Sequence, residues 1–219
     1  AGDQWQGSLE SNAFEGYTTV QVLNLMGLNA ATIGNHEFDF GPNGDDALGG
    51  DPQGALRARM KDAAFPYLSA NFGVRRKDHG KYRPLPDQRA YRLFQIDGVR
   101  IGVFGVTTEE TPATTRPGFV QNATFKSLID TTRKFARHLR EERRADLVIL
   151  LAHAGTRCNT PDAQDPLMEN KIRARSDAGD RVCNPNEELS KLLAAIEPGT
   201  VDAVVGGHAH EIVHHWIHG

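Results

Sequence analysis

The 219-residue sequence lacks the features that define several common classes of protein. No apolar run approaches the roughly 20 residues that a membrane-spanning helix requires. Lys and Arg number 25 against 28 Asp and Glu, for a net charge of −3. We expect no nucleic-acid partner, because such proteins usually carry a basic excess. Hydrophobic residues make up 39% and charged residues 24% of the chain, which excludes disordered and fibrous classes and favours one compact domain.

Cysteine is also scarce. The two cysteines, Cys158 and Cys183, exclude an all-cysteine zinc site and a disulfide-dense miniprotein. If they are paired, they close a loop of about 25 residues and stabilise the fold by roughly 3.5 kcal/mol in the chain-entropy model. Pairing would indicate an oxidising compartment, and two unrelated free thiols are the alternative interpretation.

Short apolar runs alternate with segments of helical periodicity along the chain. This alternation, with fully apolar strands, predicts a layered α/β domain. The expected helices are 14–26, 52–62, a segment whose apolar face runs from Phe125 to Leu139, and 187–196; the expected strands are 31–33, 65–72, 147–151 and 201–205, with a hairpin over 91–106 that turns at Asp97-Gly98.

Histidine is the residue type that stands out, with nine in the chain. Three strand-like runs each end in a loop that carries metal-type ligands beside small residues: Gly34-Asn35-His36-Glu37, Ala152-His153-Ala154-Gly155 and Gly206-Gly207-His208-Ala209-His210. Sites in open α/β sheets are built beyond the carboxyl ends of strands. One histidine after a strand is usually a packing residue, but three such loops favour a shared site.

Asp3 lies in a similar glycine-flanked setting near the start of the sequence. A carboxylate can bridge two divalent ions, and imidazoles with an amide oxygen can complete their ligand shells. Two ions some 3.5–4 Å apart can hold a phosphoryl group and activate water. The expected cofactor is therefore two divalent metal ions; the ligand set suits Zn, Mn, Fe or Co without choosing among them, and Mg or Ca is also compatible.

These motifs, in this order, resemble the successive blocks of the calcineurin-like metallophosphoesterases. The local context narrows the resemblance to the 5′-nucleotidase / UDP-sugar hydrolase branch, through residues 2–8, 34–41 and 65–71. The likeness is dense over residues 1–72 and later rests on the histidine loops. It implies a four-layer αββα sandwich of the metallophosphoesterase type.

The resemblance also implies a role for each ligand. Asp3 would bridge the two metals, Asn35, His153 and His208 would complete one metal site, and His210 would serve the other.

For the chemistry, the resemblance implies that His36 contacts the substrate phosphate, together with Asn35, and binds no metal. Asp39 would orient the His36 ring, and a loop-capping role is the alternative for Asp39. Glu37 is expected to be structural.

The implied activity is divalent-metal-dependent hydrolysis of a phosphoric ester, foremost a nucleoside 5′-monophosphate, by a metal-bound hydroxide. The alternatives on the same site are a UDP-sugar or 2′,3′-cyclic-nucleotide phosphodiesterase and a thiosulfohydrolase. An alternative of another class is a non-catalytic metal-binding module.

Some of the family's parts are not found in this sequence. Residues 1–219 would be a catalytic domain truncated at both ends, without the first Asp-x-His metal motif and without the C-terminal substrate domain of the full-length protein. Residues 156–186 resemble an insertion. The family's usual location implies a periplasmic or secreted protein.

Overall fold

The computed structural model describes residues 1–44, 50–75, 81–158 and 183–211. The larger sheet has the strand order β10-β9-β7-β6, in which β7, β9 and β10 are parallel and β6 is antiparallel to β7. Its strands are β6 (Tyr91–Ile96), β7 (Val99–Thr107), β9 (Leu147–His153) and β10 (Ala203–Gly206). Asp97 and Gly98, both with positive φ, form the predicted hairpin turn between β6 and β7.

Two smaller sheets complete the strand layers. One is parallel, with the order β1-β2-β5, and the other is antiparallel, with the order β4-β3-β8. Their strands are β1 (Ala31–Thr32), β2 (Tyr67–Leu68), β3 (Phe72–Arg75), β4 (Tyr82–Arg83), β5 (Gln88–Arg89) and β8 (Ala123–Phe125).

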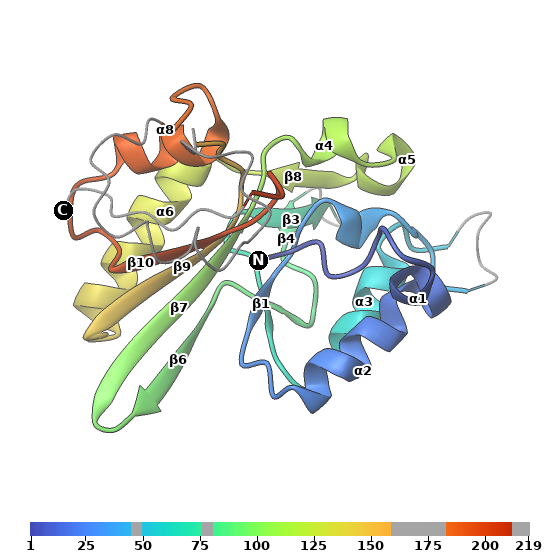
Figure 1. Ribbon diagram of the computed structural model, residues 1–219, viewed down its shortest axis with the longest axis horizontal. Coiled ribbons are helices and arrows are strands. Elements are labelled where there is room, and N and C mark those ends of the chain that lie inside the picture. The colour runs from blue at the N-terminus through green and yellow to red at the C-terminus, as the bar shows by residue number, and fades with distance from the viewer. Residues whose placement is uncertain (45–49, 76–80, 159–182, 212–219) are drawn as a thin grey trace, which may run out of the picture.

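Helices cover both outer sides of the paired sheets (Figure 1). On the large sheet lie α6 (Leu128–Arg137), which continues as a π-helical turn (His138–Glu142), and α8 (Glu188–Ala195); beyond β1 lie α1 (Leu9–Asn12), a 3₁₀ turn (Ala13–Gly16), α2 (Tyr17–Leu25) and α3 (Gly54–Asp62). Short helices α4 (Thr111–Thr114) and α5 (Pro117–Val120) follow β7, and a 3₁₀ turn (His36–Phe38) follows β1. The predicted four-layer αββα sandwich is confirmed.

Each helix layer has its own apolar core, which explains why the strands read as continuous apolar runs. Leu150 of β9 is completely buried with Leu128 of α6 and Leu192 of α8. On the other side Val20 of α2 and Leu56 of α3 pack in a second core. Apolar burial at about 25 cal/mol per Å² makes these two cores the main source of stability.

The sheets approach closely at Gly105, which explains why this position has no side chain. The amide of Ala70 donates to the carbonyl of Gly105 at 2.7 Å. A Cβ on Gly105 would lie 2.7 Å from the hydroxyl of Thr32. This contact fixes β7 against β1 and aligns the strand ends that carry the candidate site.

Three predicted boundaries were wrong. The expected strand 65–72 is split between β2 and β3, because the chain turns where the Asn71 side chain bonds the backbone of Thr107 in both directions. The helix expected from Phe14 begins at Tyr17, since Phe14 has a left-handed φ of 52°. Phe125 belongs to β8, and Ser127 caps the start of α6. Most of the apparent insertion, residues 159–182, lies outside the described residues.

Candidate metal and phosphate site

The carboxyl ends of β1, β9 and β10 converge beside the N-terminal segment (Figure 1). Ligand atoms of Asp3, His153 and His208 all lie within 4.8 Å of one another. The Asn35 side-chain oxygen lies 3.0 Å from Nε2 of His153, and a carboxylate oxygen of Asp3 lies 3.2 Å from the same nitrogen. The structure therefore brings together four of the five predicted metal-type ligands.

The fifth, His210, is placed differently. Its side chain is exposed, and it is not a member of the group formed by Asp3, His153 and His208. The backbone at His210 has a left-handed φ of 55°.

His153 ends β9 and is completely buried. Its Nδ1 donates to the carbonyl of Ala1 at 2.7 Å, and its Nε2 faces the side-chain oxygens of Asn35 and Asp3. Burial by itself would lower the pKa of His153, but the hydrogen bond and the charge of Asp3 raise it above its ordinary value.

The charges of Asp3, His153 and His208 affect one another. Burial favours the neutral form of Asp3, but its contacts with His153 and His36 hold the pKa of the Asp3 carboxyl below its usual range. Burial lowers the pKa of His208, and the neighbouring His153 lowers it further. The ring centroids of His153 and His208 are 4.9 Å apart. A carboxylate beside two imidazoles in a half-buried site is chemistry suited to a divalent cation.

Close backbone packing shapes this group. A Cβ on Gly34 would lie 2.5 Å from the amide nitrogen of Asp3 and 2.8 Å from Cε1 of His153, so only glycine fits. Asp3 has a φ of 52° and His208 a φ of 78°, both in the left-handed region that non-glycine residues rarely adopt. Such conformations persist where surrounding contacts over-determine them, and they cluster at functional sites.

His36 and Asp39 form the predicted pair, with Nδ1 of His36 2.5 Å from a carboxylate oxygen of Asp39. The backbone amide of His36 donates to Asp3 at 3.0 Å. Asp39 also accepts from Thr115 at 2.8 Å and from the Gln6 side chain at 3.0 Å. The Asp39 carboxylate therefore contacts three side chains, those of His36, Thr115 and Gln6.

Sequence reasoning missed the α4 segment. Besides Thr115, which holds Asp39, the carbonyl of Thr114 accepts the Asn35 amide at 3.2 Å and so helps to direct the Asn35 oxygen toward His153. The sequence could have indicated this segment, because it directly follows the strand β7. The carboxyl end of β7 lies at the same edge of the sheet as that of β9.

Glu37 was expected to be structural, and the structure shows what it contacts. Its side chain is 1% exposed and accepts backbone amides of Asp3, Gln4 and Gly34. Burial, with a contribution from the Asp3 charge, raises the pKa of Glu37 to about 7, against the opposing effect of the Gln4 and Gly34 amides and of His153.

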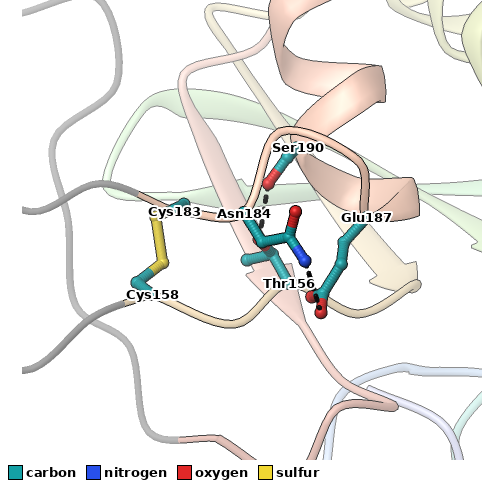
Figure 2. The surroundings of a disulfide bond; sticks show 6 residues. All are labelled: Thr156, Cys158, Cys183, Asn184, Glu187 and Ser190. Atoms are coloured by element: carbon teal, nitrogen blue, oxygen red, sulfur yellow. Dashed lines mark hydrogen bonds between the residues drawn. A yellow bond between two sulfur atoms is a disulfide. The ribbon is translucent and has the colours of Figure 1, made fainter.

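A disulfide follows the His153 loop. Cys158 and Cys183 are bonded, which answers the question that the sequence left open (Figure 2). Next to it the hydroxyls of Thr156 and Ser190 are 2.5 Å apart, joining the strand-end loop to α8 (Figure 2). Within the described part of the chain, no helix has the length and apolar character needed to cross a membrane.

Comparison with known proteins gives a consistent picture. The chain is 29% identical over 231 residues to the trifunctional nucleotide phosphoesterase protein YfkN of Bacillus subtilis, covering 97% of this chain and 13% of that protein. It is 29% identical to the 5′-nucleotidase of Rattus norvegicus, covering 98% of this chain and 29% of the relative. The chain thus spans less than a third of these relatives. No protein-family model matches it.

Solved structures share the fold. The calcineurin-like phosphoesterase YfkN from Bacillus subtilis superimposes with a TM-score of 0.61 at 19% identity, covering 96% of this chain and 57% of that one. A 5′-nucleotidase precursor from Thermus thermophilus gives a TM-score of 0.60 at 24% identity, covering 95% and 31%.

Fold and sequence point to the same class: the chain is similar in both to a calcineurin-like phosphoesterase. Within that class its relatives are 5′-nucleotidases and nucleotide phosphoesterases, which are hydrolases.

Proposed function

We propose that this chain carries the metal site of a divalent-metal-dependent phosphoric ester hydrolase. The observation that carries the proposal is the convergence of Asp3, His153 and His208 within 4.8 Å, from segments about 150 and 200 residues apart in the sequence. With the oxygen of Asn35, the donors are a carboxylate, an amide and two imidazoles. This mixed set fits a divalent transition metal.

Asp3, Asn35, His153 and His208 would hold one divalent ion, whereas the exposed side chain of His210 lies outside this group. When bound, such ions withdraw charge from phosphoryl oxygens and make water a stronger nucleophile. The chain's own part is to orient the ligands. The hydrogen bond from His153 to Ala1 fixes its tautomer, and the carbonyl of Thr114 fixes the Asn35 amide.

The His36–Asp39 pair would act on the substrate. The contact between Nδ1 of His36 and Asp39 fixes the orientation of the ring and leaves Nε2 free to face the substrate. An Nε2–H group there would donate to a phosphate oxygen and stabilise charge that develops as the ester bond breaks. Thr115 and Gln6 donate to Asp39 and so hold it in place beside His36.

The proposed substrates are nucleoside 5′-monophosphates, because sequence relatives carry the name 5′-nucleotidase. The relatives are more than three times as long as this chain, so we propose that a further domain contributes contacts to the nucleoside. The Cys158–Cys183 bond supports a periplasmic or secreted location, since structural disulfides persist in oxidising compartments.

Phosphate release measured with and without Mn²⁺ tests the proposal. Adenosine 5′-monophosphate should be hydrolysed in the presence of Mn²⁺, and excess EDTA should abolish the reaction. UDP-glucose and 2′,3′-cyclic adenosine monophosphate, supplied to the same preparation, test the alternative substrates. Stoichiometric Mn²⁺ binding without hydrolysis of any of these esters, or of p-nitrophenyl phosphate, would refute the catalytic assignment and indicate a metal-binding module.

A further inference from the structure

The buried carboxylate of Glu37 binds both of the loops that build the site. One oxygen, Oε1, accepts the backbone amide of Gln4 at 2.6 Å. The other, Oε2, accepts the amide of Asp3 at 2.8 Å and also that of Gly34. With its side chain 1% exposed, Glu37 has no access to solvent that could replace these donors. Both carboxylate oxygens are therefore used within the site.

The position of these amides gives the contact a particular consequence. The amides of Asp3 and Gln4 belong to the two peptide planes on either side of the Asp3 α-carbon. A single carboxylate that accepts both amides restrains φ and ψ of Asp3 together. This restraint matters because Asp3 has a left-handed φ of 52°, a conformation that is unfavourable for an L-residue unless surrounding contacts hold it.

The Asp3 side chain is restrained by the same structural unit. Its Oδ1 accepts the backbone amide of His36, the residue next to Glu37 in the 3₁₀ turn. The backbone of Asp3 is thus bound to the side chain of Glu37, and the side chain of Asp3 is bound to the backbone of His36. This reciprocal pair of contacts leaves the other Asp3 oxygen, Oδ2, facing His153 at 3.2 Å.

We propose that Glu37 is a positioning residue for the metal site: its carboxylate holds Asp3 in the strained backbone conformation that presents the Asp3 side chain to a divalent ion. The proposal rests on the metal site described under Proposed function. It requires both oxygens of Glu37, so a side chain with one acceptor cannot replace it. Contacts that orient a ligand in this way typically affect metal affinity by 10–100-fold.

The test uses Glu37→Gln, which keeps the shape of the side chain but turns one acceptor into a donor. A matched control is Glu10→Gln, which makes the same chemical change on an exposed residue of α1. Amide hydrogen exchange measured by NMR on the metal-free proteins reports the contact directly. In Glu37→Gln the amides of Asp3 and Gln4 should exchange at least tenfold faster, while those of β9 keep their wild-type rates.

Calorimetric titration with Mn²⁺ then reports the consequence. Glu37→Gln should bind Mn²⁺ about 10–100-fold more weakly, and Glu10→Gln should match the wild type. Wild-type exchange rates or wild-type Mn²⁺ affinity in a folded Glu37→Gln variant would overturn the proposal. If the variant does not fold, amide exchange is measured on the wild-type protein instead. Exchange at Asp3 and Gln4 as fast as that of unprotected amides would also overturn the proposal.

The two proposals fail in different ways. A wild-type chain that binds no Mn²⁺ would refute the metal site of the proposed function. Faster exchange at Asp3 and Gln4 in Glu37→Gln would still confirm that Glu37 fixes the Asp3 backbone.

Discussion

Replacing Gly34 with alanine tests whether the position of Asp3 matters when every ligand is kept. A Cβ at this position would lie 2.5 Å from the amide nitrogen of Asp3 and 2.8 Å from Cε1 of His153. It would also lie 2.3 Å from Oδ1 of Asp3. Ordinary contacts begin near 3.4 Å, so the Asp3 segment must move by about 0.9 to 1.1 Å. The φ of Gly34 is not left-handed, so alanine adds crowding without backbone strain.

A displacement of this size should weaken Mn²⁺ binding at least tenfold. It should also lower kcat/KM for adenosine 5′-monophosphate by about 100-fold, since misplacement by about 1 Å can cost that much. Overpacking should reduce the free energy of unfolding by about 1–3 kcal/mol. Gly118→Ala in α5 is the control, because its Cβ would meet nothing within 4 Å. Wild-type affinity and kcat/KM in a folded Gly34→Ala variant would refute the reasoning.

Three further predictions follow from the same contacts. His36→Asn should lower turnover at least 100-fold while bound metal, measured by mass spectrometry, stays at the wild-type level; loss of one ion per chain would instead make His36 a ligand. In EDTA, raising the pH from 4.5 through 7 should lower the free energy of unfolding by about 3 kcal/mol, because the folded state holds the Glu37 proton up to its pKa of about 7. Urea titrations of Glu37→Gln should not show this loss of stability. Parallel curves of stability against pH for the variant and the wild type would contradict the assignment. Replacing Cys158 and Cys183 by serine should lower the free energy of unfolding by roughly 3.5 kcal/mol, because the disulfide joins residues with a sequence separation of 25. An unchanged midpoint of urea unfolding would contradict this prediction.

The sequence was sufficient to predict that side chains at the strand ends lie close together. His153 and His208 each follow a fully apolar run, and parallel strands place their carboxyl ends at one edge. The layered α/β architecture followed from the same alternation. Strand and helix ends were less predictable, because the left-handed backbone at Phe14 and the side-chain bonds of Asn71 leave no periodic signal.

The supporting contacts could not be predicted, for a physical reason. Thr115 binds Asp39 across 76 residues, and Glu37 acts on backbone amides that are present at nearly every position of a sequence. Neither interaction alters residue spacing or composition. They become visible only when the loops are placed together in three dimensions.

Anomalous X-ray diffraction from crystals grown with Mn²⁺ tests the central claim most directly. We predict an anomalous peak within coordinating distance, about 2.0–2.3 Å, of the ligand atoms of Asp3, Asn35, His153 and His208. A folded protein saturated with Mn²⁺ that shows no peak there, or that binds the ion elsewhere, would contradict the account.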